Sequence, residues 1–108
     1  MNIDIKVFHK RRLVGEAVTW SLRFAYNYDA TYVEDIHDFD NLLQESTIIL
    51  TDSIHFFLLL KAGHIAGSKT IVLVNDIEHD DIISILLAGA KTIIDLSKGP
   101  ELMIEKIK

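Results

Sequence analysis

Five short β-branched segments alternate with segments of helical periodicity, and this alternation restricts the fold more than any other feature of the chain. The candidate strands are residues 3–8, 28–33, 47–51, 70–74 and 91–95. Two of them, 47–51 and 70–74, are nearly continuous apolar runs, the pattern of strands covered on both faces of a parallel sheet. Parallel strands need crossovers, and right-handed crossovers give a doubly wound α/β fold. We therefore predict a five-stranded parallel sheet of order 2-1-3-4-5 with helices on both faces.

The segments between these strands have the apolar spacing of amphipathic helices. The candidate helices cover about 11–26, 36–44, 54–62 and 78–89, and a last helix begins at Pro100. The predicted core positions are the best apolar face of the first helix and three aromatic residues: Val14, Ala17, Val18, Leu22, Ala25, Trp20, Phe56 and Phe57. The third helix is apolar on every face, which predicts burial by the fold or by a partner.

Composition limits the class of protein. The chain has 108 residues, which indicates a single domain over 1–108, with a net charge of −5 and no cysteine. The negative charge disfavours broad nucleic-acid or anionic-membrane binding, and the lack of cysteine excludes disulfides and zinc–thiolate sites. No apolar stretch approaches the ~20 residues that span a bilayer. The N-terminus does not have the pattern of a signal peptide, so we expect a cytoplasmic protein.

Polar residues gather where three of the predicted strands end. His9-Lys10-Arg11-Arg12 follow the first strand, Asp52-Ser53 follow the third, and Asn75-Asp76 follow the fourth. Ligands of open parallel sheets bind in the crevice outside the carboxyl ends of the strands. This edge of the sheet is therefore the predicted functional site.

Other chemistries have little support in the sequence. Four further histidines are scattered without ligand spacing: His37, His55, His64 and His79. Gly63 and Gly67 do not form a phosphate loop, because no lysine-serine pair opens a helix after them. We therefore expect neither a bound metal nor a cofactor.

Three segments resemble the CheY-like receiver domain of bacterial response regulators. Residues 86–94 (LLAGAKTII) resemble the family's passage from its fourth helix into its fifth strand. Residues 97–102 (SKGPEL) resemble its polar loop and Pro-Glu-Leu helix start, and residues 13–18 (LVGEAV) resemble the start of its first helix. These matches are nearest to receivers that carry a C-terminal LuxR/NarL-type helix-turn-helix. The resemblance implies a flavodoxin-like, receiver-like fold and a role in two-component signal transduction.

The resemblance also implies a chemistry that this chain departs from. Family members phosphorylate an aspartate at the end of strand three, beside an acidic pair that binds Mg²⁺. Here His9 and Lys10 stand at the acidic-pair positions, and Asp52 reaches the acceptor position only with a shift of one residue. The family's Ser/Thr and Lys positions are filled by Val74 or Asn75 and by Leu96, with Lys98 two residues further on.

A positive side chain beside Asp52 attracts its carboxylate and repels a divalent cation. We therefore predict that Lys10 or His9 pairs with Asp52 and supplies permanently the charge that metal and phosphoryl supply elsewhere in the family. With Asn75 and Lys98, these residues form the predicted pseudo-phosphorylation site. A simpler interpretation stays open, in which Asp52 caps the third helix and Asn75 caps the fourth.

The sequence favours a non-enzymatic regulatory domain, the N-terminal part of a transcriptional response regulator. We expect it to act as a homodimer or by docking, through the helix 4–strand 5–helix 5 face or the helix 1–helix 5 face. DNA contact would belong to a module beyond Lys108. One alternative is a working phosphorelay receiver that uses Asp52. Another is a small flavodoxin-like cofactor-binding protein, which the basic residues after strand one disfavour.

Overall fold

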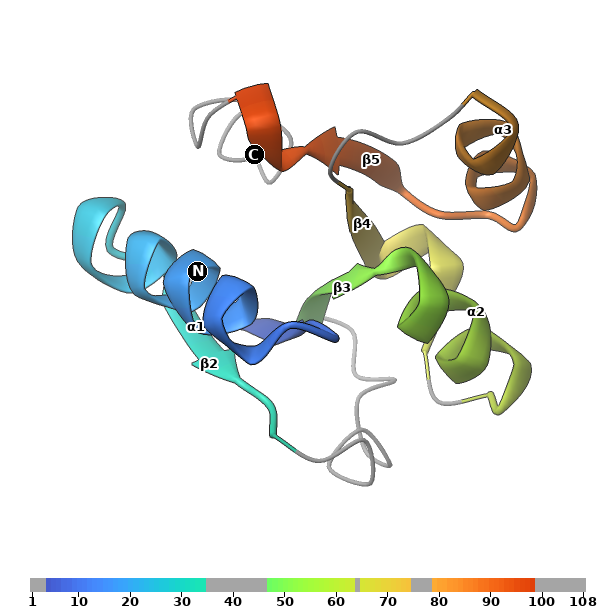
Figure 1. Cartoon of the computed structure of the whole chain (residues 1–108). Coiled ribbons are helices and arrows are strands. Elements are labelled where there is room, and N and C mark those ends of the chain that lie inside the picture. The colour runs from blue at the N-terminus through green and yellow to red at the C-terminus, as the bar shows by residue number, and fades with distance from the viewer. Residues whose placement is uncertain (1–3, 35–46, 64, 75–78, 99–108) are drawn as a thin grey trace.

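A doubly wound parallel sheet forms the centre of the molecule. The computed structural model describes residues 4–34, 47–63, 65–74 and 79–98. The strands are β1 (Asp4–Phe8), β2 (Asp29–Tyr32), β3 (Thr47–Asp52), β4 (Thr70–Val74) and β5 (Thr92–Asp95) (Figure 1). They pair in parallel throughout, in the order β2-β1-β3-β4-β5. The predicted fold class and strand order are confirmed.

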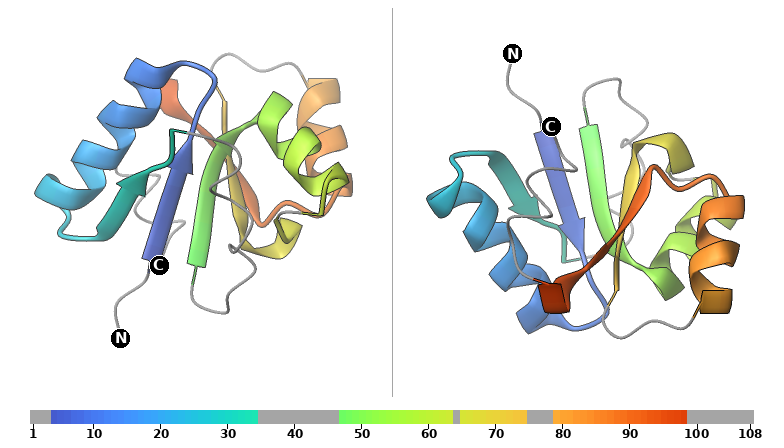
Figure 2. Two further views of the ribbon diagram at one scale, coloured as in Figure 1. Left: turned by 90° about the horizontal axis from the view of Figure 1, so that it is seen from below. Right: turned by 90° about the horizontal axis from the view of Figure 1, so that it is seen from above.

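Helices cover both faces of this sheet. The α-helices are α1 (Arg12–Trp20), α2 (Ser53–Lys61) and α3 (His79–Leu87). Shorter helical turns are the π-helix η1 (Ser21–Ala25) and the 3-10 turns η3 (Gly67–Lys69) and η4 (Leu96–Lys98). Figure 2 shows α1 on one side of the sheet and α2 with α3 on the other. The helices predicted over 36–44 and from Pro100 lie outside the described residues. No helix in the described ranges has the length and apolar character needed to cross a membrane.

The core consists of two apolar layers, one on each face of the sheet. On the α1 side, strand residues such as Ile5 and Leu50 pack with Val18 and Leu22. The layer on the other side has these buried members: Val33, Ile49, Phe56, Leu59, Ile65, Val72, Val74 and Ile85. Because both faces are buried, the central strands can be apolar at consecutive positions, which explains the continuous runs in the sequence.

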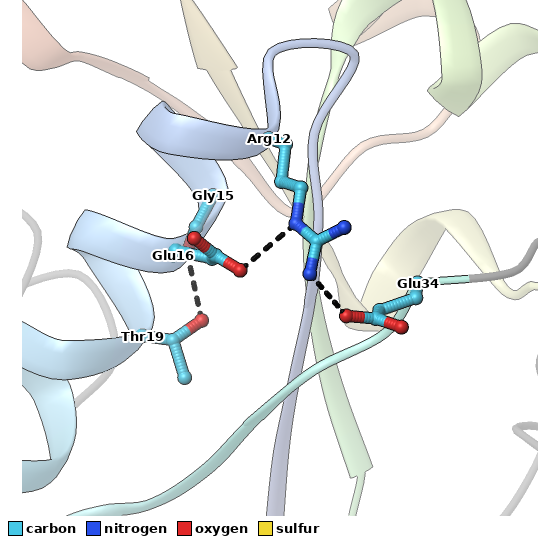
Figure 3. Close-up of polar contacts among 5 residues, drawn as sticks. All are labelled: Arg12, Gly15, Glu16, Thr19 and Glu34. Atoms are coloured by element: carbon cyan, nitrogen blue, oxygen red, sulfur yellow. Dashed lines mark hydrogen bonds and ion pairs between the residues drawn. The ribbon is translucent and has the colours of Figure 1, made fainter.

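The buried side of the first helix agrees only in part with the prediction, in which Val18 and Leu22 are confirmed as buried. The sequence placed Ala17 and Ala25 in the core, and both are exposed. Gly15 and Thr19 are buried instead. A Cβ atom on Gly15 would lie 2.4 Å from Cε1 of Tyr32, so the helix approaches β2 at a place where only a hydrogen fits. The Thr19 hydroxyl donates to the carbonyl oxygen of Gly15 at 2.8 Å, which satisfies its polar atom inside this tight contact (Figure 3).

Two aromatic residues that were predicted to be buried lie on the surface. Trp20 is 62% exposed and Phe57 is 41% exposed, whereas Phe56 is fully buried as predicted. The helical repeat explains Phe57, because Phe56 and Leu59 share the side of α2 that packs on the sheet. The Trp20 ring instead stacks on the ring of Phe24, with centroids 4.5 Å apart.

The first helix also ends differently from the prediction of one continuous helix to Tyr26. Regular α-helix stops at Trp20 and a π-helical turn follows. The backbone N–H of Tyr28 donates to the carbonyl oxygen of Leu22 at 2.8 Å, closing the turn. Asn27 has a φ of 58°, a left-handed conformation that asparagine tolerates better than most residues. This turn directs the chain into β2.

Candidate functional site

The predicted site lies where β1 and β3 end side by side. Phe8, the last residue of β1, pairs with Thr51, the penultimate residue of β3. His9 and Lys10 therefore follow β1 next to Asp52 at the end of β3. The structure brings together three of the five residues that were predicted to form this site.

Asp52 is buried, and both oxygens of its carboxylate accept hydrogen bonds from the protein. Only 2% of the residue is exposed. Oδ1 accepts a hydrogen bond from the backbone N–H of Lys10 at 2.9 Å and lies 2.8 Å from Nδ1 of His55. Oδ2 accepts from the backbone N–H of His55 at 3.2 Å. Asp52 is thus the N-cap of α2, the simpler of the two interpretations that the sequence left open.

The expected pairing of Asp52 with the side chain of Lys10 or His9 is replaced by a different one. Lys10 reaches Asp52 through its main chain, because the end of β1 points its N–H toward β3 while the lysine side chain is exposed. The side-chain contact is made by His55, three residues after Asp52 on the first turn of α2, whose Nδ1 lies 2.8 Å from Oδ1 of Asp52. Sequence reasoning missed this residue, although position N3 after an N-cap is where a side chain can reach back to the cap.

His9 is buried beside this carboxylate but acts differently from the prediction. Its Nδ1 accepts a hydrogen bond from the backbone N–H of Arg11 at 3.0 Å. Burial lowers the pKa of His9 from its ordinary value of 6.5, and the negative charge of Asp52 opposes that effect. His9 is therefore neutral at pH 7 and does not supply a permanent positive charge.

The rest of the basic segment is partly used for structure. Nε of Arg12 donates to Glu16 at 3.0 Å, and the same guanidinium pairs with Glu34 just after β2 (Figure 3). Hydrogen bonding by Glu16, together with the charge of Glu34, raises the pKa of Arg12. The Arg12 side chain consequently joins the start of α1 to the end of β2 rather than facing the site.

Thr51 adds an unusual polar group next to Asp52. It is fully buried, and its hydroxyl has no hydrogen-bond partner in the part of the chain that the structure describes. A buried hydroxyl without a partner is uncommon in folded proteins.

The two remaining predicted site residues cannot be placed in the same way. Asn75 lies outside the described residues, so its predicted role as a cap or site residue stays a prediction. Lys98 ends the short turn η4 directly after β5, at the same edge of the sheet, and its side chain is not described. In that turn Ser97 donates from both its N–H and its hydroxyl to Asp95, at 2.9 and 2.6 Å.

The donor set at this edge does not fit the Mg²⁺ that the resemblance implies. Magnesium prefers oxygen ligands and keeps several waters. Here the acidic-pair positions hold His9 and Lys10, and the oxygens of Asp52 already accept from protein N–H groups. In the described ranges, no three His, Asp or Glu side chains are grouped so that they could hold a metal ion.

The chain has a flavodoxin-like, receiver-type fold, and the carboxylate at the end of β3 caps α2. A solved structure with a similar fold is the crystal structure of FixJ-N, at a TM-score of 0.78. The match covers 99% of this chain and 91% of that chain at 13% sequence identity, so it shows the fold alone. No protein-family model matches the sequence, and no curated protein matches it either.

Proposed function

We propose that this chain is a receiver-like regulatory domain of a transcriptional regulator, that it is not an enzyme, and that it works without phosphorylation of Asp52. The observation that carries the proposal is the burial and hydrogen bonding of the Asp52 carboxylate. A phosphoryl acceptor needs an oxygen that is open to in-line attack, with charge stabilisation around it. The buried carboxylate of Asp52 instead receives three contacts from Lys10 and His55.

The residues after β1 support the same proposal. Phosphoryl transfer to a carboxylate depends on a metal ion that neutralises the moving charge. A histidine and a lysine at the metal-binding positions supply no hard oxygen ligand, and the lysine charge repels a divalent cation. The receiver-type fold supports a regulatory role for the domain.

The test uses beryllofluoride with Mg²⁺, which mimics a phosphoryl group on aspartate. We expect no stoichiometric binding in calorimetry, and no acetyl phosphate-derived phosphoryl group on Asp52 by mass spectrometry. In calorimetry, Asp52→Asn should likewise bind no beryllofluoride. Magnesium-dependent binding that is lost in Asp52→Asn but kept in Asp29→Asn, a change at an exposed residue of β2, would establish the phosphorelay alternative instead.

We also propose that the domain acts as a homodimer. Each of the two surfaces expected from the sequence carries large exposed apolar side chains. On α3 these are Ile83, Leu86 and Leu87, and on α1 with η1 they are Leu13, Trp20 and Phe24. Exposed apolar residues that gather on one helix face are typical of interaction sites.

Sedimentation equilibrium distinguishes the two surfaces. We expect Ile83→Ser with Leu87→Ser, or else Trp20→Ser with Phe24→Ser, to convert the dimer to a monomer, whereas the other pair leaves it intact. Each pair serves as the matched control for the other, since all four side chains are more than half exposed. A protein that stays monomeric at high micromolar concentration contradicts dimerisation. Docking to another protein would then be the proposed mode of action.

The net charge of −5 supports the proposal that this domain does not contact DNA itself. DNA binding would then belong to a module beyond Lys108. We expect the domain alone to give no shift of duplex DNA in electrophoresis at low salt. A tight complex would contradict this part of the proposal.

A further inference from the structure

His55 is held by Asp52 in a way that prepares one of its ring nitrogens for chemistry. Its Nδ1 lies 2.8 Å from Oδ1 of Asp52. A carboxylate can only accept a hydrogen bond, so in the neutral imidazole Nδ1 carries the proton and Nε2 carries the lone pair. This is the arrangement in which a buried carboxylate fixes the tautomer and orientation of an imidazole that reacts through its other nitrogen.

The ring is fixed but remains accessible. The edge-to-face contact with Phe8, with centroids 4.6 Å apart, holds the ring on a second side. About a quarter of the His55 side chain is exposed, against almost none of the Asp52 side chain. Within the described residues, Nε2 makes no hydrogen bond and no ion pair.

The surroundings suit an anionic group. His55 lies in the first turn of the nine-residue helix α2, whose N-terminus carries partial positive charge. The N–H of Lys10 binds the same Asp52 oxygen as the imidazole does, so the exposed Lys10 side chain begins next to the ring. Lys10 and Arg11 make no ion pair within the described residues, and both are exposed.

We propose that His55, through Nε2, is the phosphoryl acceptor at this edge of the sheet, and that its donor is a small acyl phosphate. In the step, the Nε2 lone pair forms the N–P bond. The P–O bond to the acyl carboxylate breaks, and its electron pair leaves with the carboxylate product. The ring becomes an imidazolium that keeps its Nδ1 proton, and the negative charge of Asp52 stabilises it.

Asp52 is thus a positioning residue for His55 and not an acceptor. This inference rests on the proposed function, because it requires the carboxylate to be unavailable for phosphorylation. It goes beyond that function by naming the residue through which a phosphate donor could regulate the domain.

The test is incubation of the full chain with acetyl phosphate, followed by mapping of the phosphoryl group at neutral pH by mass spectrometry. We expect one phosphoryl group on His55, labile in acid and resistant to hydroxylamine, as phosphoramidates are. His55→Gln should abolish it. Asp52→Asn should slow its formation by at least about tenfold, a typical loss when the partner that orients a functional histidine is changed. Asparagine is as good an N-cap as aspartate, so the helix start is preserved and thermal melting provides the check.

The matched control is His79→Gln, which changes the first residue of α3 and should leave the rate unchanged. Each other outcome has a distinct meaning. A hydroxylamine-sensitive phosphoryl group on Asp52 overturns both this inference and the proposed function. No phosphoryl group, or groups spread evenly over several histidines, overturns the inference alone and leaves the proposed function standing.

Discussion

The two helices that follow β1 and β3 pack on opposite faces of one sheet, and they begin by different means. Helix α2 begins with a side-chain cap, in which Asp52 accepts the N–H of His55. Helix α1 has Arg11 at its N-cap position and no side-chain cap. Its first turn is held by the Arg12 side chain, which contacts Glu16 and Glu34.

The same helices also reach the sheet differently. Helix α2 inserts large side chains, Phe56 and Leu59, into the layer between helix and sheet. Helix α1 approaches through Gly15, where a single added carbon would meet Tyr32. The packing of α2 therefore depends on large buried side chains and on a buried carboxylate. The packing of α1 depends instead on the lack of a side chain at Gly15. Each kind of interface should fail under a different substitution.

Removing volume under α2 is expected to have the largest effect. Phe56 is fully buried, so Phe56→Ala loses both its transfer free energy and the contacts around the cavity. We expect the free energy of unfolding to fall by about 4 kcal/mol, measured by urea denaturation. Phe57→Ala, on the next residue of the helix, should cost less than about 1 kcal/mol. Equal losses for both variants would show that α2 does not pack on the sheet by the face that carries Phe56 and Leu59.

Removing the cap should follow in size. Asp52→Ala deletes the N-cap of α2 and leaves the N–H of Lys10 without its acceptor. The two effects together are expected to cost about 3 kcal/mol. Asp52→Asn keeps an oxygen acceptor and should cost less than half as much in the same urea titration. If Asn and Ala are equally destabilising, the charge of the carboxylate matters more than its capping bonds.

Adding volume under α1 should come next. Gly15→Ala places a methyl group against the Tyr32 ring, and we expect a loss of about 2 kcal/mol even though alanine favours helix. A double-mutant cycle with Tyr32→Ala gives the sharper measurement, because removal of the ring should cancel most of the penalty. Additive losses in the cycle would contradict the steric origin.

The difference between the two helices also explains what the sequence could predict. Strand positions came within about one residue of the observed bounds, because apolar runs between turn signals depend on burial alone. The predicted face of α1 was right for Val18 and wrong for Ala17, because Gly15 and Thr19, which carry little or no apolar signal, complete the buried side. The predicted side-chain pairing of Lys10 with Asp52 was wrong for a related reason. Lys10 contacts Asp52 through its main-chain N–H, and the identity of a residue does not reveal main-chain contacts. The cap itself was foreseeable, since aspartate before a helix is a common N-cap.

The smallest expected effect is a pH dependence of stability that comes from His9, the residue directly after β1. Burial lowers the pKa of His9 below 6.5 in the folded protein. Between that lowered pKa and about 6.5, the unfolded chain binds more protons than the folded one, so stability rises with pH in this window. The contribution of neutral His9 is complete above about 6.5 and is lost as pH falls through the folded pKa. Urea titrations of the unchanged protein and of His9→Gln between about pH 5 and 7.5 isolate it. The free energy of unfolding of the unchanged protein should fall more steeply toward acid, and parallel curves would mean that His9 is as solvated as an ordinary surface histidine.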